Sequence, residues 1–141
     1  MTKSILLALV TTASALAATP AAAERPPSGH PLVGTWKWTH KESNCSEVYV
    51  FRADGTASIE SRDERTDNTF TVAKEPDANG FYRVVVLTTK DHGGKDCVND
   101  SANNTGLESV NHHLFTPDRN QMLTCYEPSR NACFGPLRRV K

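Results

Sequence analysis

The sequence lacks the motifs that assign most enzymes to a class. It contains no G-x-S-x-G, S-x-x-K or H-E-x-x-H motif and no glycine-rich phosphate loop. It also lacks closely spaced cysteine pairs of the zinc-site type, because the shortest spacing between two cysteines is eight positions. No motif places a base beside a nucleophile, so we expect a protein that is not an enzyme and needs no cofactor.

An excess of charge of one sign is also missing. The chain has 16 Lys plus Arg and 16 Asp plus Glu, which gives a formal net charge of zero. Removal of residues 1–23 takes away Lys3 and no acidic residue, and leaves a net charge of −1. Nucleic acid is therefore not an expected partner, and no polybasic run indicates binding to a membrane surface.

Long apolar runs are confined to the N-terminus. Lys3 precedes the apolar segment 5–10, and two small-x-small sites end at Ala17 and Ala23. This pattern predicts a secretory signal peptide over residues 1–23, cleaved after Ala23 or, as an alternative, after Ala17. The apolar run is too short for a permanent membrane span. We therefore expect an exported protein, periplasmic or extracellular.

Four cysteines follow the predicted signal, and an even number in an exported chain indicates two disulfides. Cys125 and Cys133 flank a turn-like stretch between two expected strands, and opposed hairpin positions lie within disulfide reach. The remaining pair is Cys45 with Cys97. That second bond would join a long polar loop, residues 91–107, to the start of the second strand.

Short β-type segments separated by turn signals occupy the rest of the chain, and no segment has a clear 3.6-residue apolar repeat. The expected strands are 35–39, 48–51, 57–60, 70–72, 81–89, 110–115, 122–126 and 133–140. About eight sequential strands with tight turns predict an all-β fold, a small antiparallel up-and-down barrel over residues 32–141. A proline-rich, extended arm is expected before it at residues 24–31. We expect a monomer.

Gly34-Thr35-Trp36, at the start of the first expected strand, resembles the G-x-W motif of lipocalins and other calycins. That superfamily includes avidin-like barrels and a family of small bacterial metalloprotease inhibitors. The resemblance implies that Trp36 packs beneath an arginine near the end of the chain, where Arg138 and Arg139 are available. We expect Arg139, because it shares a strand face with Leu137. The chain departs from lipocalins in having no room for a helix after the barrel.

The leading functional hypothesis is a binding protein for a small, largely apolar ligand held inside the barrel. Residues 91–107 would form the lid. The expected lining comprises Trp36 and Trp38, Val84 and Val86 (or Val85 and Leu87), and Leu114 (or Phe115). The alternative is a protease inhibitor that acts through the arm at 24–31, because a pre-stiffened segment loses little entropy on entering a cleft.

No metal site is predicted. His112 and His113 are adjacent on an expected strand, so their side chains would point to opposite faces of the sheet. The acidic residues of the 91–107 loop do not match the spacing of a calcium-binding loop.

Overall fold

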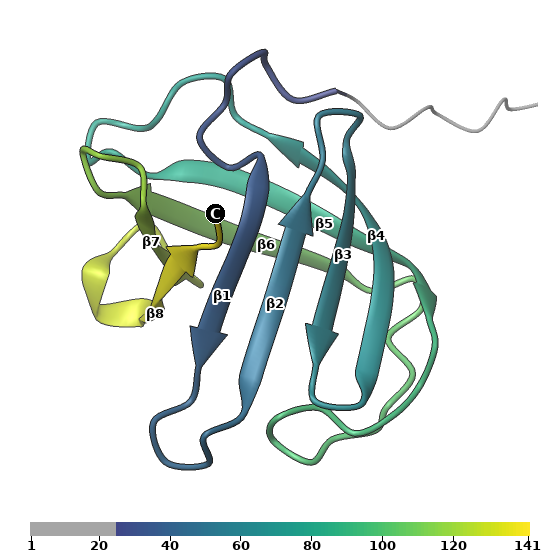
Figure 1. The fold of residues 1–141 in the computed structure, drawn as a ribbon. Helices are drawn as coiled ribbons and strands as arrows, with labels where there is room; N and C mark the ends of the chain where they lie inside the picture. Colours follow the sequence, from purple (N-terminus) through teal and green to yellow (C-terminus); the bar gives the residue numbers. More distant parts are fainter. Residues whose placement is uncertain (1–24) are drawn as a thin grey trace, which may run out of the picture.

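The computed structural model describes residues 25–141, which form a closed antiparallel barrel (Figure 1). Eight strands follow one another around the barrel in chain order, and β8 pairs with β1 to close it. The strands are β1 (Gly34–Thr39), β2 (Ser46–Phe51), β3 (Thr56–Ser61), β4 (Glu64–Val72), β5 (Tyr82–Asp91), β6 (Glu108–Phe115), β7 (Gln121–Cys125) and β8 (Cys133–Arg139), with a short 3-10 turn, η1 (Arg130–Ala132), before the last. This confirms the predicted fold class.

The predicted signal peptide, residues 1–23, lies outside the described residues. Within residues 25–141, no helix is long and apolar enough to cross a membrane.

Strand β4 begins six residues earlier than the sequence pattern predicts. Its first half, 64–69, carries charged and polar side chains on both faces, so no apolar alternation marks it as a strand. All six residues are nevertheless paired with β3, after a tight turn in which Arg62 adopts a φ of 53°. Thr66 and Asn68 point into the barrel and are buried there. Polar side chains inside the barrel therefore concealed this strand in the sequence.

The two ends of the barrel differ. At one end, called the closed end here, lie the turns at 52–55, 73–81 and 116–120 together with the N-terminal arm, 25–33. At the other, called the open end, lie the loops 40–45, 62–63, 92–107 and 126–132.

The core fills the half of the barrel nearest the closed end. Trp36 lies 5.7 Å from Phe115 between ring centroids, and Phe51 lies 5.1 Å from Phe70 with its ring edge-on. Burial of such aromatic side chains supplies much of the stability of a small barrel. The buried residues that form this core cluster are Leu32, Trp36, Phe51, Ala57, Phe70, Val84, Val86, Met122 and Leu137.

Both disulfides lie at the open end, and the predicted pairing is confirmed. Cys125 and Cys133 are directly opposed in the β7–β8 ladder, with Cα atoms 3.9 Å apart. Cys45 bonds to Cys97 across 52 positions and joins the β1–β2 loop to the 92–107 loop.

The long loop at 92–107 is fastened to the barrel wall. Beyond its disulfide, the Cys97 amide donates to Ser61 Oγ at 3.0 Å. The Asp63 amide donates to the carbonyl of Lys95 at 3.0 Å, and the Asn104 amide group donates to Glu64 at 3.0 Å. These bonds hold the loop against the β3–β4 hairpin. A loop fastened in this way is poorly suited to act as the mobile lid that the sequence predicted.

Candidate functional site

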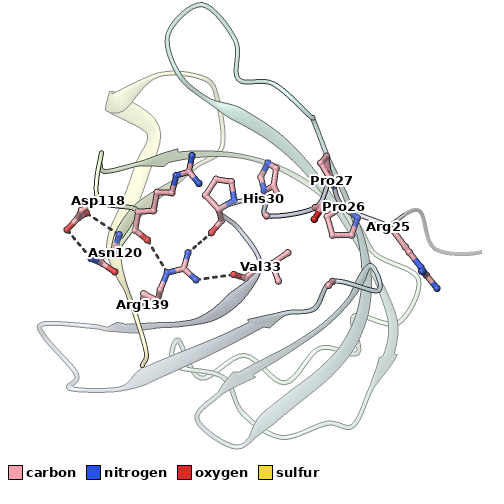
Figure 2. Close-up of a pocket in the computed structure, with 13 residues that line it drawn as sticks. Arg25, Pro26, Pro27, His30, Val33, Asp118, Asn120 and Arg139 are labelled. Carbon is pink, nitrogen blue, oxygen red and sulfur yellow. Dashed lines mark hydrogen bonds between the residues drawn. The ribbon is translucent and has the colours of Figure 1, made fainter.

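The N-terminal arm folds back over the closed end instead of extending away from it (Figure 2). The His30 amide donates to the carbonyl of Pro27 at 3.1 Å, and the Val33 amide donates to that of His30 at 3.1 Å. His30 is buried with its ring edge-on to Tyr82, 4.8 Å away between centroids. Packed structure therefore begins at His30, two residues before the expected start of the barrel.

Trp36 and Arg139 form the centre of the closed end. Trp36 is completely buried, and its indole nitrogen donates to the carbonyl of Leu32 at 2.9 Å. Arg139 Cζ lies 4.2 Å from the Trp36 ring centroid, within the range of a cation–π contact. Of the two arginines that the resemblance offered, Arg139 occupies this place, and Arg138 pairs with Lys37 in the sheet.

The Arg139 guanidinium uses its donors on backbone carbonyls (Figure 2). It donates to the carbonyls of Pro31 at 2.6 Å, Val33 at 3.0 Å and Arg119 at 3.0 Å. Gly34 has a φ of 139°, and a Cβ atom there would collide with the guanidinium. Glycine is therefore required at this position, and Arg139 ties the arm to β8 and to the β6–β7 turn.

A depression of about 700 Å³ lies between the arm and the turn at 118–120 (Figure 2). Its polar groups are largely engaged with one another. Asp118 accepts hydrogen bonds from the Asn120 side chain and backbone and from Thr116, and Arg139 is held by three carbonyls. These contacts give Asp118 and Arg139 a structural role at the closed end, while His30, which also lines the depression, has a buried Nε2 atom without a hydrogen-bond partner in the protein.

The open end contains a cavity of about 440 Å³ inside the barrel. Its lining combines aromatic, aliphatic and neutral polar side chains, and includes no Lys, Arg, Asp or Glu. The lining residues are Tyr49, Phe51, Ile59, Asn68, Val86, Thr88, Ser109, Val110, Asn111, His113, Thr124, Tyr126 and Phe134.

The residues expected to line a ligand site lie in four different places. Val86 lines the cavity, whereas Val84 and Trp36 are completely buried in the core below it. Trp38 is half-buried and packs against the lining residue Phe134, with ring centroids 4.8 Å apart. Leu114 lines a separate depression beside Pro117 and Pro136.

Leu114 lies outside this cavity because side chains alternate across a strand. His113 and Phe115, both on β6, face the interior of the barrel, and their ring centroids are 6.5 Å apart. Leu114 lies between them in the strand and therefore faces outward. Phe115, the alternative, points inward but packs on Trp36 in the filled half of the barrel.

The sequence interpretation missed the polar half of the lining. Thr88 lies on the same strand face as Val84 and Val86, so alternation along β5 could have located it. The same period places Ser109 and Asn111 on the face of β6 that His113 occupies. All of these side chains are polar, whereas the sequence predicted an apolar lining.

His113 is a neutral cavity residue. It is 3% exposed, and burial, followed by the neighbouring charges of His112 and His30, lowers its pKa to about 3. Its Nδ1 atom is 3.2 Å from Thr124 Oγ1. The imidazole therefore offers hydrogen bonding but no charge at neutral pH.

Asn68 presents an acceptor without a partner. The side chain is 3% exposed, and its Nδ2 donates to the carbonyl of Thr66 at 3.2 Å and to Thr66 Oγ1 at 3.0 Å. Asn68 Oδ1 is buried and has no hydrogen-bond partner in the protein. Such unpartnered buried groups are uncommon and often mark a site that a bound molecule completes.

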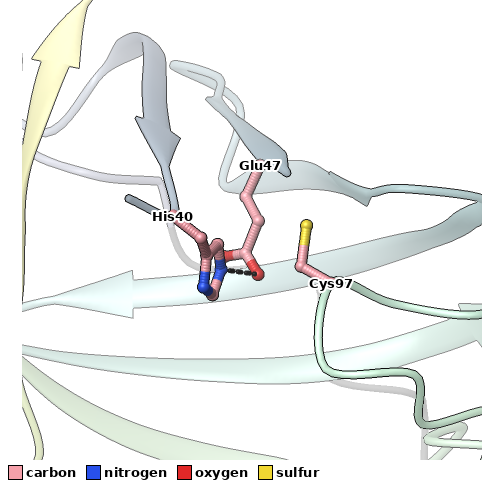
Figure 3. A group of neighbouring side chains, drawn as sticks. All are labelled: His40, Glu47 and Cys97. Atoms are coloured by element: carbon pink, nitrogen blue, oxygen red, sulfur yellow. Dashed lines mark hydrogen bonds and ion pairs between the residues drawn. The ribbon is translucent and has the colours of Figure 1, made fainter. Parts of the chain in front are cut away.

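Glu47 is the centre of a hydrogen-bonded cluster next to the lining residue Tyr49, and Figure 3 shows Glu47 beside His40 and Cys97. The Glu47 carboxylate accepts from the Tyr49 hydroxyl and from Ser61 Oγ at 3.0 Å, and it lies 3.1 Å from His40 Nε2. Burial, reinforced by the Glu47 charge, raises the pKa of Tyr49, so its hydroxyl stays protonated and donates. The cluster holds the Tyr49 ring in the cavity wall.

Cys97 lies in the same cluster, with ligand atoms of the three residues within 4.8 Å of one another. Metals bind the cysteine thiolate, and Cys97 Sγ is bonded to Cys45. His40 and Glu47 alone do not make the three or four protein ligands of a typical transition-metal site. The group in Figure 3 therefore supports Tyr49 in the cavity wall of the disulfide-bonded protein.

Comparisons with protein families, with curated proteins and with solved structures give no match for this chain. The function of the site must therefore be inferred from its own chemistry, which is that of a neutral, partly aromatic cavity at one end of a disulfide-bonded barrel.

Proposed function

We propose that this chain is an exported, lipocalin-like barrel that binds one small molecule inside its open end. The observation that carries the proposal is the cavity of about 440 Å³, a size typical of small-molecule sites. The core and the Trp36–Arg139 contact fill the closed end, so a ligand would enter from the opposite side.

The proposal of export rests on two features. The pattern of residues 1–23 is that of a signal peptide, and both pairs of cysteines form disulfides, which persist in oxidising compartments. Amino-terminal sequencing of the protein recovered from the periplasm or the medium tests this part. A mature chain that begins at Glu24 or at Ala18 supports it, and an uncleaved cytoplasmic protein contradicts it.

The arm does not favour the alternative of protease inhibition. An inhibitory segment needs to enter a partner's cleft, and here His30 is buried while the Pro31 carbonyl is held by Arg139. Withdrawal of the arm would break these contacts. We therefore place the proposed function at the open end.

The test is a titration of the oxidised mature protein with small aromatics, quinones and fatty acids, followed through tryptophan emission. Trp38 packs on Phe134 in the cavity wall, so a bound ligand is expected to quench or shift its emission. The Trp38→Phe variant keeps Trp36 and should lose most of the response while still binding ligand by calorimetry.

A matched pair of variants locates the site. Ser109→Phe adds a ring inside the cavity and is expected to weaken binding at least tenfold. Leu114→Phe makes a similar change at the separate depression and should leave binding unchanged. No response to any member of the panel, in a protein shown to be folded and oxidised, would contradict the proposal.

A further inference from the structure

The polar groups of the open-end cavity narrow the class of ligand, and this inference rests on the proposed function. We infer that the cavity selects a neutral, flat ring that donates a hydrogen bond, from N–H or O–H, to Asn68 Oδ1. The largely apolar ligand expected from the sequence would leave this acceptor unpaired.

The orientation of the Asn68 amide follows from its neighbours. The Thr66 carbonyl can only accept a hydrogen bond, so the group 3.2 Å from it must be the Asn68 NH₂. Asn68 Oδ1 is then the free end of the amide, buried and without a protein partner. A buried acceptor in this state is destabilising. Asn68 lines the cavity while Oδ1 itself is covered, so a ligand donor reaches this atom, and relieves the cost, after a small movement of the amide.

The charges around the cavity favour a neutral ligand. The lining set includes no Lys, Arg, Asp or Glu, and the shifted pKa values of His113 and Tyr49 keep both side chains neutral at neutral pH. The nearby Glu47 carboxylate is already engaged by Tyr49, Ser61 and His40. A cation or anion would lose its hydration without gaining a counter-ion.

The walls favour a flat ring. Phe51, Tyr49 and Phe134 bring aromatic rings to one cavity, and ring faces and edges pack well against a planar ligand. Thr88, Ser109 and Asn111 add neutral groups that can bind the polar atoms of a substituted ring. Planar lactams, azoles and phenols have this combination of a flat ring and a neutral donor.

The experiment compares matched ligands that differ in one donor, measured by isothermal titration calorimetry on the oxidised mature protein. The pairs are indole against benzofuran and 2-naphthol against 2-fluoronaphthalene, and indole-3-carboxylate tests the effect of charge. We expect the donor of each pair to bind at least tenfold more tightly than its partner. Indole should also bind more tightly than its carboxylate.

Variants assign the preference to Asn68. Asn68→Ala, with Asn68→Ser as a second variant should the first fail to fold, is expected to reduce the donor preference to less than threefold. Leu114→Ala, at the separate depression, is the control and should retain the preference. Thermal unfolding of each variant verifies that it is folded.

The outcomes separate this inference from the proposed function. Binding of both members of each pair with equal affinity, or tighter binding of the carboxylate, overturns the inference and leaves a small-molecule site in place. A preference that survives in the Asn68 variants also overturns it. Absence of binding by every ligand of this set and of the broader panel refutes both.

Discussion

Replacement of Arg139 by alanine is expected to lower the free energy of unfolding by about 3 kcal/mol. The guanidinium donates three hydrogen bonds to backbone carbonyls, each contributing about 1 kcal/mol net. Its contact with the Trp36 ring contributes about 0.5–1 kcal/mol. The total stays near 3 kcal/mol because water can reach the released carbonyls through the depression at the closed end.

Urea unfolding of the oxidised protein, followed by tryptophan emission, measures this change. The corresponding fall in melting temperature is about 10 °C for a domain of this size. Arg139→Lys keeps the charge but loses the planar fork, so we expect a loss of about 2 kcal/mol. Arg138→Ala is the matched control, because Arg138 is exposed and its replacement should change stability by less than about 0.5 kcal/mol.

A local measurement completes the test. Hydrogen exchange at the Val33 amide and the Trp36 indole should accelerate in Arg139→Ala, since the arm loses its link to β8. If Arg139→Ala and Arg138→Ala unfold at the same urea concentration, within about 0.5 kcal/mol, Arg139 does not stabilise the closed end.

Three further predictions concern other parts of the barrel. Gly34→Ala should lower the free energy of unfolding by about 2–3 kcal/mol, because alanine is strained at a φ of 139° and its Cβ would displace the Arg139 guanidinium. Thermal unfolding measures this loss. Replacement of both Cys45 and Cys97 by serine should lower the free energy of unfolding by about 4 kcal/mol, against about 2–3 kcal/mol for the Cys125–Cys133 pair. The first disulfide closes a loop of 52 positions and the second a loop of 8, and the longer loop loses more entropy on closure. His113 should make the protein less stable in acid: its native pKa of about 3 lies below the unfolded value of 6.5, so between these values the unfolded state binds the extra proton. Stability should therefore fall by up to about 1.4 kcal/mol per pH unit below pH 6.5, as measured by urea unfolding at pH 4.5–7.

The controls for these predictions differ. Gly29→Ala has open space around the new Cβ and a positive φ, so it separates backbone strain from collision with the arginine. Equal losses from the two disulfide variants would contradict the loop-length argument. His113→Gln should flatten the pH dependence of stability above pH 4.5, and an unchanged slope in that variant would show that His113 does not cause it.

Local patterns in the sequence were enough to predict the architecture of this protein. Alternation around Trp36 and the valine-rich segment of β5 predicted strands, and turn residues between them predicted sequential antiparallel pairing. The opposed hairpin positions of Cys125 and Cys133 determined one disulfide, and the even cysteine count then determined the other. The resemblance to the G-x-W motif implied an arginine beside Trp36, and the face shared by Leu137 and Arg139 selected Arg139 over Arg138. The other inferences needed only neighbours in the chain and the period of a strand.

The tertiary structure alone decided what the barrel encloses. Asn68 belongs to a strand that its polar sequence concealed, and it shares a cavity with His113 because β4 and β6 lie on either side of β5 and both side chains line the interior. On β6 the sequence predicted Leu114 as a lining residue, whereas its neighbours His113 and Phe115 face the interior. An error of one residue has this effect because adjacent side chains face opposite sides of a sheet. Whether the interior is filled or hollow depends on the summed volume of side chains from all eight strands. That sum is a property of the packed barrel, and no single segment of sequence contains it.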